Sequence, residues 1–148
     1  MMDIRFHILN EFVEKFIVCE STYSHSGKKK ALNFDINNYP KFKNKISYIV
    51  IDEEPPNIIG DKNGLAKPFE KRSDSLKRIN LSYDYMIKAL SNINENDLII
   101  LSDNDEIPNL NSKQFKNSKR DILIFKQLFF YYKFNLEYDL IPWFGSKA

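Results

Sequence analysis

KFIVCES, residues 15–21, is a short apolar run that ends in polar residues, which is the pattern of a buried β-strand. Two later stretches share this design. They are KISYIVID, residues 45–52, which is followed by two prolines at 55 and 56, and DLIILS, residues 97–102. Strands of this kind, alternating with helical patterns, indicate an α/β fold with a mostly parallel sheet.

The helical patterns lie before the first of these runs and between the second and the third. Residues 4–14 carry apolar side chains at helical spacing. A second amphipathic helix is predicted to reach about Ser91, with Ser73 or Asp74 as its N-terminal cap. Residues 57–72 contain two glycines and a proline, and they indicate a long loop.

The C-terminal part of the chain is rich in aromatic residues. Residues 121–135 predict one strand, or two strands joined by a bend, and residues 136–148 are expected to be irregular. The aromatic stripe is expected to pack in a core or an interface rather than to bind a ligand. It consists of Phe125, Phe129, Phe130, Tyr131, Tyr132 and Phe134.

Length and composition narrow the class of protein. A chain of 148 residues has the size of one ordinary domain, so we expect a single domain over residues 1–148. A net charge of +2 argues against nucleic acid as the main partner. Without an apolar run of about 20 residues or a signal-peptide pattern, we expect a cytoplasmic protein with no transmembrane segment, at most peripherally attached to a membrane.

Polar clusters follow all three predicted strands. They are Glu20-Ser21, Asp52-Glu53-Glu54 and Asp103-Asn104-Asp105-Glu106. Ligands of open α/β sheets bind at the carboxyl ends of the strands, and parallel strands bring those ends to one edge. The sequence therefore predicts that these clusters meet in one cleft.

The cluster at residues 103–106 allows three interpretations. A solvated acidic turn is the simplest, because Asp and Asn favour turns. A calcium loop of the EF-hand type is excluded, since such a loop that began at Asp103 would need glycine where Pro108 stands and glutamate where Gln114 stands. The third interpretation is a divalent-metal site, in which the cation offsets the repulsion between the carboxylates and holds a phosphate group.

Two enzyme classes place Asp-x-Asp after an apolar strand. Phosphatases of the haloacid dehalogenase type would use Asp103 as nucleophile together with Asp105, but their motif normally lies near the N-terminus and continues with Thr or Val where this chain has Ile107. Glycosyltransferases of the GT-A type carry the motif about a hundred residues into the chain. There it holds a metal against the diphosphate of a nucleotide sugar. The position in this chain fits the second class better.

Four blocks together resemble glycosyltransferase family 17, the family of β-1,4-mannosyl-glycoprotein 4-β-N-acetylglucosaminyltransferase. They are IRFHILNEFVEKFIVCESTYSHSGKKKALNF, RSDSLKRINLSYDYMIKAL, DLIILSDNDEIPNL and WFGSKA. The first contains a Ser-His-Ser-Gly-Lys loop at residues 24–28, and the third contains the Asp-x-Asp-Glu-Ile-Pro signature. The blocks occur in the family's order and cover nearly the whole chain.

The resemblance implies a GT-A-like, Rossmann-like domain with a mostly parallel sheet flanked by helices. It also implies an inverting transfer of a sugar, GlcNAc above all, from a UDP-sugar donor to a hydroxyl of a glycan acceptor, with Mn²⁺ or Mg²⁺ as cofactor. Asp105 would bind the metal with Asp103, and Trp143 would stack on the acceptor. The donor would contact Glu20, Ser21, Lys28, Arg78 and Asp103.

The chain also departs from the family's pattern. Members are longer at both ends, so the fold is expected to be incomplete, and an inactive truncated module that binds nucleotide or a protein partner is an alternative. An inverting transfer needs a base near the acceptor hydroxyl. Glu137 and Asp139 are the late carboxylates that could serve.

Overall fold

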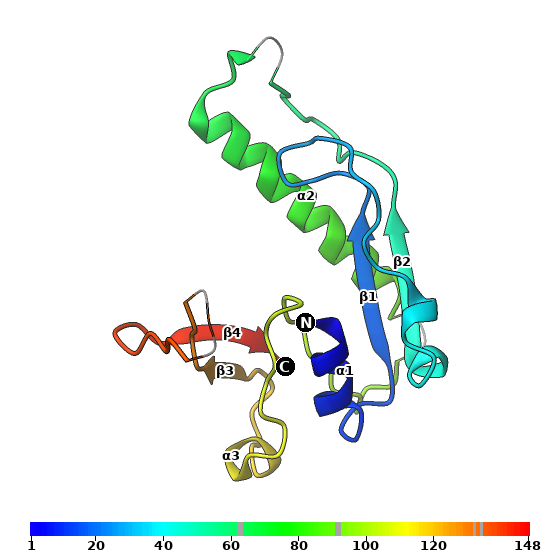
Figure 1. Cartoon of the computed structure of the whole chain (residues 1–148), viewed down its shortest axis with the longest axis vertical. Helices are drawn as coiled ribbons and strands as arrows, with labels where there is room; N and C mark the ends of the chain where they lie inside the picture. Colours follow the sequence, from blue (N-terminus) through cyan, green and yellow to red (C-terminus); the bar gives the residue numbers. More distant parts are fainter. Residues whose placement is uncertain (62–63, 91–92, 132, 134) are drawn as a thin grey trace. The chain divides into compact units, whose positions relative to one another are not determined.

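The fold is known from a computed structural model, which describes residues 1–61, 64–90, 93–131, 133 and 135–148. The chain divides into two units. One is the continuous segment Lys15–Ile93, and the other joins Met1–Glu14 to Asn94–Ala148 (Figure 1). The single domain predicted for residues 1–148 stays a prediction.

Two parallel strands form the sheet of the first unit. β1 (Phe16–Ser21) pairs with β2 (Ile46–Ile51) from Phe16↔Ile46 to Ser21↔Ile51. Both strands confirm the prediction, because their apolar runs are rich in β-branched side chains that favour a strand. The connection between them contains two short 3-10 helices, η1 (Ile36–Asn38) and η2 (Lys43–Lys45).

One long helix, α2 (Pro68–Lys88), packs against both strands of this sheet (Figure 1). The prediction that it begins with a cap at Ser73 or Asp74 was wrong. Pro68 stands at the first helical position, where its fixed φ suits a helix, and Glu70 accepts a hydrogen bond from the backbone N–H of Lys67 at 2.7 Å. The predicted end near Ser91 falls outside the described residues.

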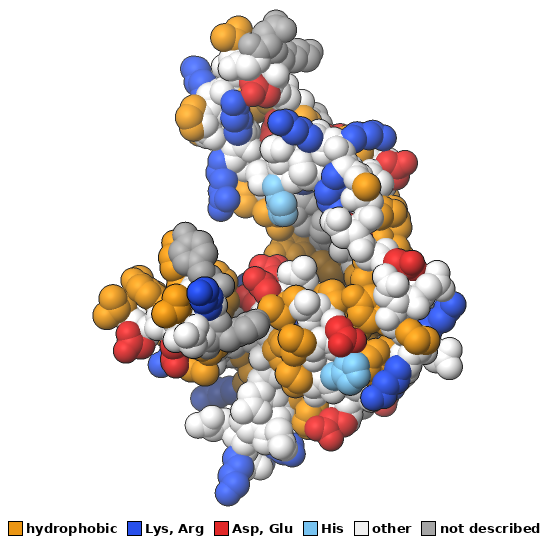
Figure 2. Space-filling model, viewed as in Figure 1, with side chains coloured by type: hydrophobic (Ala, Val, Ile, Leu, Met, Phe, Trp, Pro, Cys, Tyr) orange, Lys and Arg blue, Asp and Glu red, His pale blue; other side chains and the backbone are white. Residues whose placement is uncertain are grey.

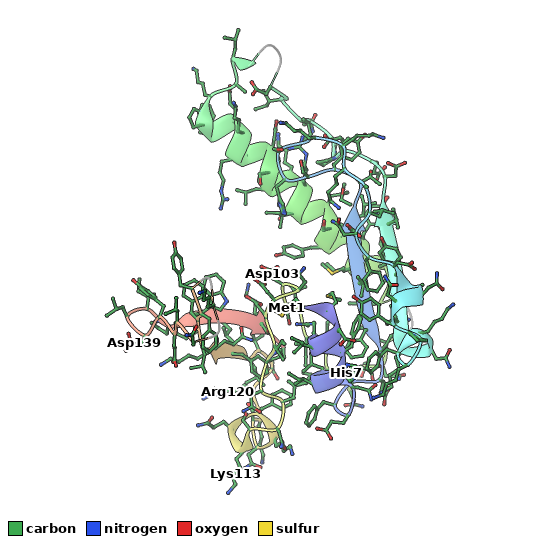
Figure 3. All side chains as sticks on the ribbon, in the orientation of Figure 1. Met1, His7, Asp103, Lys113, Arg120 and Asp139 are labelled. Atoms are coloured by element: carbon green, nitrogen blue, oxygen red, sulfur yellow. The ribbon has the colours of Figure 1, made fainter. Side chains whose placement is uncertain are left out.

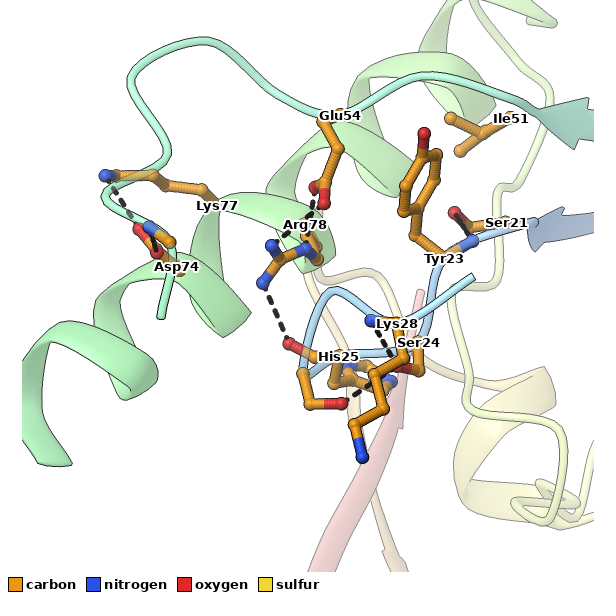
Figure 4. Close-up of polar contacts among 12 residues, drawn as sticks. Ser21, Tyr23, Ser24, His25, Lys28, Ile51, Glu54, Asp74, Lys77 and Arg78 are labelled. Atoms are coloured by element: carbon orange, nitrogen blue, oxygen red, sulfur yellow. Dashed lines mark hydrogen bonds and ion pairs between the residues drawn. The ribbon is translucent and has the colours of Figure 1, made fainter. Parts of the chain in front are cut away.

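Asp74 is instead a buried side chain within α2, with 4% of its surface exposed. Its carboxylate accepts hydrogen bonds from the backbone N–H groups of Ile59, at 3.1 Å, and Gly60, at 2.9 Å. Lys77 Nζ lies 3.2 Å away on the next turn (Figure 4). Asp74 therefore ties the connection between β2 and α2 to the helix.

The second unit contains two short helices and an antiparallel pair of strands. They are α1 (Met2–Leu9), α3 (Lys113–Lys116), β3 (Ile124–Gln127) and β4 (Trp143–Lys147). β3 and β4 pair with an irregularity between Ile124 and Lys126. Of the aromatic stripe predicted for this region, Tyr132 and Phe134 lie outside the described residues.

Two predictions for this unit were wrong. Residues 97–102 do not form a strand: only Leu101 is bridged, to Lys147, while Leu98 and Ile99 are largely exposed. An apolar run becomes a strand only where a partner pairs along its length, and here β4 meets it at a single residue. Within the tail expected to be irregular, Trp143–Lys147 form β4, because residues 124–127 supply a partner strand.

The α/β class is confirmed, but the prediction of a mostly parallel sheet is correct only in part. Among the described residues one two-stranded sheet is parallel and the other is antiparallel. No helix in the described part of the chain has the length and apolar character needed to cross a membrane. Figure 2 shows hydrophobic side chains on the surface of the molecule. In the second unit, Leu128, Leu140 and Phe144 are among the exposed ones.

Candidate functional site

A cavity of about 330 Å³ lies at the carboxyl end of β1 in the first unit. β1 and the residues after it contribute Cys19, Glu20, Ser21 and Tyr23, α2 contributes Arg78 and Ser82, and the loop after β1 contributes Ser24, His25 and Lys30. The parallel pairing of β1 and β2 places the polar clusters after both strands at this edge of the sheet, as predicted. The third cluster belongs to the other unit.

The side chain of Glu20 in the cavity wall accepts several hydrogen bonds. Its carboxylate accepts hydrogen bonds from Lys30 Nζ at 2.6 Å, from Tyr48 Oη at 3.0 Å and from the backbone N–H groups of Asn33 and Phe34. Burial alone would raise the pKa of Glu20, but these donors outweigh burial and lower the pKa to about 2. Glu20 thus anchors residues 30–34 to the sheet.

Tyr48 belongs to the same network from β2. Burial and its hydrogen bond to the Glu20 carboxylate raise the pKa of the Tyr48 phenol to about 12. A phenol with so high a pKa keeps its proton at neutral pH and remains a hydrogen-bond donor. Tyr48 could not be found from the sequence, because the alternation of side chains along a strand does not show which residue of the neighbouring strand a side chain will contact.

The three acidic residues after β2 are also held by donors from the chain. Asp52 accepts a hydrogen bond from Thr22 Oγ1 at 2.6 Å, and Glu53 accepts one from Tyr85 Oη at 2.7 Å. Glu54 receives two from Arg78, at 2.7 and 3.0 Å. This cluster therefore joins β2 to the loop after β1 and to α2.

Arg78 lines the cavity with a guanidinium group that the fold already orients. Nε and Nη2 donate to the carboxylate of Glu54, and Nη1 donates to the carbonyl of His25 at 3.1 Å (Figure 4). Gly27 makes this approach possible, because a Cβ at that position would collide with the guanidinium. The φ of Gly27 is +85°, which favours glycine in any case.

Ser21 and Lys28 have local backbone roles. Ser21 Oγ accepts a hydrogen bond from the N–H of Tyr23 at 3.0 Å, and the N–H of Lys28 donates to Ser24 Oγ at 3.1 Å (Figure 4). Ser21 lines the cavity, whereas Lys28 lies in the adjoining loop. Cys19 also lines it, and burial raises the pKa of its thiol.

In the second unit, residues Asp103 to Glu106 form a β-turn. The N–H of Glu106 donates to the carbonyl of Asp103 at 3.1 Å, and the N–H of Asp103 donates back to the Glu106 carboxylate at 3.2 Å. Asp favours the first position of such turns. The side chains of Asp103 and Asp105 are exposed, so their carboxylates face solvent.

Arg5, which sequence reasoning missed, lies against this turn. Its Nη1 donates to the carbonyls of Asp103, at 3.4 Å, and of Glu106. Burial lowers the pKa of Arg5, while the charges of Glu106 and Asp105 act to raise it. Part of the positive charge that the acidic cluster requires is therefore supplied by the chain itself.

Glu106 connects the turn to β4. Its carboxylate accepts a hydrogen bond from Trp143 Nε1 at 2.9 Å and lies 3.5 Å from Ser146 Oγ. The ring of Trp143 stacks on Phe129, with ring centroids 5.6 Å apart, and 44% of Trp143 remains exposed. The side chain predicted to bind acceptor is thus fixed in orientation beside the acidic turn.

The two predicted metal ligands provide a small set of oxygen donors. No group of three or more His, Cys, Asp or Glu side chains suited to a metal ion occurs among the described residues. Mg²⁺ and similar cations are commonly held by one or two carboxylates together with substrate phosphates and water. Two exposed carboxylates on one turn, Asp103 and Asp105, fit that kind of site.

The candidate bases Glu137 and Asp139 lie in the segment between β3 and β4. Figure 3 shows Asp139 at the outer tip of this segment, far from Asp103 in the same unit. Glu137 forms a backbone bridge with Phe130. Among the described residues, neither side chain forms a hydrogen bond or an ion pair with the acidic turn, and their role as base stays a prediction.

Comparison with known proteins agrees with the motifs. The sequence model of glycosyltransferase family 17 matches residues 1–146. The chain is similar to the human, rat and mouse proteins named beta-1,4-mannosyl-glycoprotein 4-beta-N-acetylglucosaminyltransferase. Each is 30% identical over 112 residues, which cover 73% of this chain and 19% of the relative. The chain therefore spans about a fifth of the length of these curated relatives, and no solved structure matches it.

Proposed function

This chain belongs to glycosyltransferase family 17, and we propose that it forms the donor-binding part of an inverting N-acetylglucosaminyltransferase. The donor is a UDP-sugar, UDP-GlcNAc, and the acceptor is a hydroxyl group of a glycan. The names of the matched relatives support the transferred sugar. Family membership also argues against a phosphatase of the haloacid dehalogenase type.

The cavity at the carboxyl end of β1 is the observation that carries this proposal. It lies where α/β sheets bind their ligands, and its volume of about 330 Å³ is at the small end of the range for ligand sites. Its lining offers the ring of Tyr23 and the hydroxyls of Ser21 and Ser82 to a nucleoside. Arg78 and the adjoining Lys28 supply positive charge for a diphosphate.

The roles of Glu20 and Arg78 in donor binding are indirect in this proposal. The carboxylate of Glu20 already accepts hydrogen bonds from Lys30, Tyr48 and the backbone of residues 33 and 34, so Glu20 shapes the wall of the cavity. Nε and Nη2 of Arg78 already donate to Glu54, so Arg78 contributes positive charge and a fixed cavity wall but has no free pair of donors for a bidentate contact with the diphosphate.

We assign Mn²⁺ or Mg²⁺ to Asp105 and Asp103 of the acidic turn. When bound, such a cation offsets the negative charge that develops on the leaving diphosphate. The residues of the chain hold the carboxylates in place: the turn presents both side chains to solvent, and Glu106 fixes the turn to β4. Trp143 then offers an aromatic face to a sugar ring of the acceptor.

Thiol labelling tests the nucleotide site directly, because Cys19 is the one cysteine of the chain and lines the cavity. A maleimide reagent reacts with the thiolate form of Cys19. Because burial raises the pKa of this thiol, labelling should become faster as the pH rises above neutral. Saturating UDP is expected to slow labelling at least about tenfold, which is a difference of about 1.4 kcal/mol, and ADP is expected to slow it less. Cys19→Ser controls for background reaction. A labelling rate that UDP leaves unchanged would rule out this cavity as the nucleotide site.

A further inference from the structure

The turn at residues 103–106 is held from one side by α1. Arg5 Nη1 donates to the carbonyl of Asp103, the first residue of the turn, and to the carbonyl of Glu106, the last. One guanidinium nitrogen therefore contacts both ends of a four-residue turn. Asp103 and Asp105 are exposed, so this contact leaves both carboxylates accessible to a ligand.

Arg5 also brings charge to the acidic turn. Its guanidinium lies near enough to Glu106 and Asp105 for both carboxylates to stabilise its charge. Like charges that are close together repel, and a cation beside them reduces that repulsion. The turn can thus keep its acidic side chains together before any metal ion binds.

β4 holds the same turn from a second direction. Trp143 Nε1 and Ser146 Oγ contact the Glu106 carboxylate, at 2.9 and 3.5 Å. Gly145 lies between them, where a Cβ would collide with the side chains of Glu106 and Gln127. Glu106 is thereby occupied by β4, which leaves Asp103 and Asp105 as the carboxylates of the turn that are exposed.

We propose that Arg5 is a positioning residue for the metal–diphosphate site: by donating to the carbonyls of Asp103 and Glu106, it fixes the orientation in which Asp103 and Asp105 meet a divalent cation. The inference rests on the proposed function. It concerns the geometry of the turn, which can be measured without metal, so the two ideas can fail separately.

Hydrogen exchange in the metal-free protein tests the positioning role. The amides of Asp103 and Glu106 donate within the turn, so loss of Arg5 is expected to open the turn. In Arg5→Ala we expect exchange over residues 103–106 to become about tenfold faster, since hydrogen bonds to charged groups are worth about one such factor or more. Arg5→Lys, which keeps the charge and one donor, should recover part of the protection.

Arg120→Ala is the matched control, because Arg120 is an exposed arginine of the same unit (Figure 3). It should leave exchange at residues 103–106 unchanged. Exchange in β1 serves as an internal reference. If Arg5→Ala is unfolded and exchanges faster throughout the chain, Arg5→Met, which keeps the length of the side chain without its donors or charge, takes its place in the comparison with Arg5→Lys. Protection of residues 103–106 in the folded donor-free variant equal to that of the unaltered chain would overturn the proposal.

Titration with UDP, with and without Mn²⁺, tests the consequence for the ligand. In Arg5→Ala we expect the affinity for UDP with Mn²⁺ to fall about tenfold and the affinity without metal to stay unchanged, with partial recovery in Arg5→Lys. If Mn²⁺ does not strengthen UDP binding to the unaltered chain, the metal part of the proposed function fails, and hydrogen exchange still judges whether Arg5 holds the turn. If exchange changes while Mn²⁺-dependent affinity does not, Arg5 is structural only and the inference is wrong.

Discussion

Arg78 donates two hydrogen bonds to the carboxylate of Glu54, from Nε to Oε2 at 2.7 Å and from Nη2 to Oε1 at 3.0 Å. Because Arg78 also donates to the carbonyl of His25, one side chain of α2 joins the loop after β1 to the segment after β2. Arg78 therefore helps to hold the cavity wall at this edge of the sheet, together with the contacts of Thr22 to Asp52 and of Lys30 to Glu20. Replacement of Arg78 should therefore lower the free energy of unfolding of the first unit.

Replacement of Arg78 by alanine should destabilise the first unit by about 2 kcal/mol, because Glu54 would lose its two charged hydrogen bonds in a partly buried place. Urea unfolding followed by circular dichroism at 222 nm, to which α2 contributes strongly, measures the loss. Arg72→Ala, an exposed arginine of the same helix, should cost less than about 0.5 kcal/mol. Equal losses in the two variants would show that the Glu54 contact contributes nothing specific.

Gly27→Ala should cost more than Gly60→Ala. Both glycines have positive φ, +85° and +72°, so each substitution carries a backbone penalty of about 1 kcal/mol. Gly60 has open space around the Cβ position, whereas a Cβ at Gly27 meets the guanidinium of Arg78. The difference between the two free energies of unfolding measures this collision, and no difference would mean that Arg78 can move away without cost.

Glu20 should make stability depend on pH in the acid range. Its pKa in the folded chain is about 2, below the value of 4.5 for an ordinary glutamate, so its contribution is complete above about pH 4.5 and is lost as the pH falls toward 2. We expect this contribution to be about 2 kcal/mol, reduced from the full linkage value because the site is near solvent.

Urea unfolding of the unaltered chain and of Glu20→Gln at pH 7, 5, 4 and 3 checks this dependence. The two curves should differ at pH 7 and converge as the pH falls. Glu11→Gln, at an exposed glutamate, should run parallel to the unaltered chain. A constant difference between the unaltered chain and Glu20→Gln over this range would mean that the pKa of Glu20 is not lowered on folding.

Trp143 is the one tryptophan of the chain, so its fluorescence reports on the proposed acceptor surface. A glycan acceptor that stacks on its exposed face should change the emission intensity in a saturable way. Trp143→Phe keeps a ring for stacking on Phe129 but loses the donor to Glu106, and should weaken glycan binding measured by calorimetry. Emission that no glycan changes would remove Trp143 from the acceptor site.

The first unit could be predicted well because its signals are local. The apolar runs of β1 and β2 carry β-branched residues and end in polar clusters, and parallel pairing follows from that pattern. The start of α2 was misjudged because Asp74 has the chemistry of a cap, whereas its actual partners are the N–H groups of Ile59 and Gly60. Such partners, about 15 residues away in sequence, leave no local trace.

The second unit could be predicted less well because its order depends on distant pairing. The run at residues 97–102 has strand-like composition but meets β4 at Leu101 alone, and the tail that contains β4 was predicted to be irregular because its partner strand lies elsewhere in the sequence. The acidic turn was found from its residues. Arg5, about a hundred positions away, could not be, because nothing in a short helix reveals which turn its guanidinium contacts.

The most direct test of the account is a calorimetric titration of the chain with UDP, with and without Mn²⁺, repeated with Asp105→Asn and with Asp121→Asn as a control at an exposed aspartate of the same unit. If Asp105 binds a cation that holds the diphosphate, Mn²⁺ should raise the affinity of the unaltered chain and of Asp121→Asn at least about tenfold, and Asp105→Asn should lose that gain. The same UDP affinity in every arm would show that Asp105 holds no cation that binds the diphosphate.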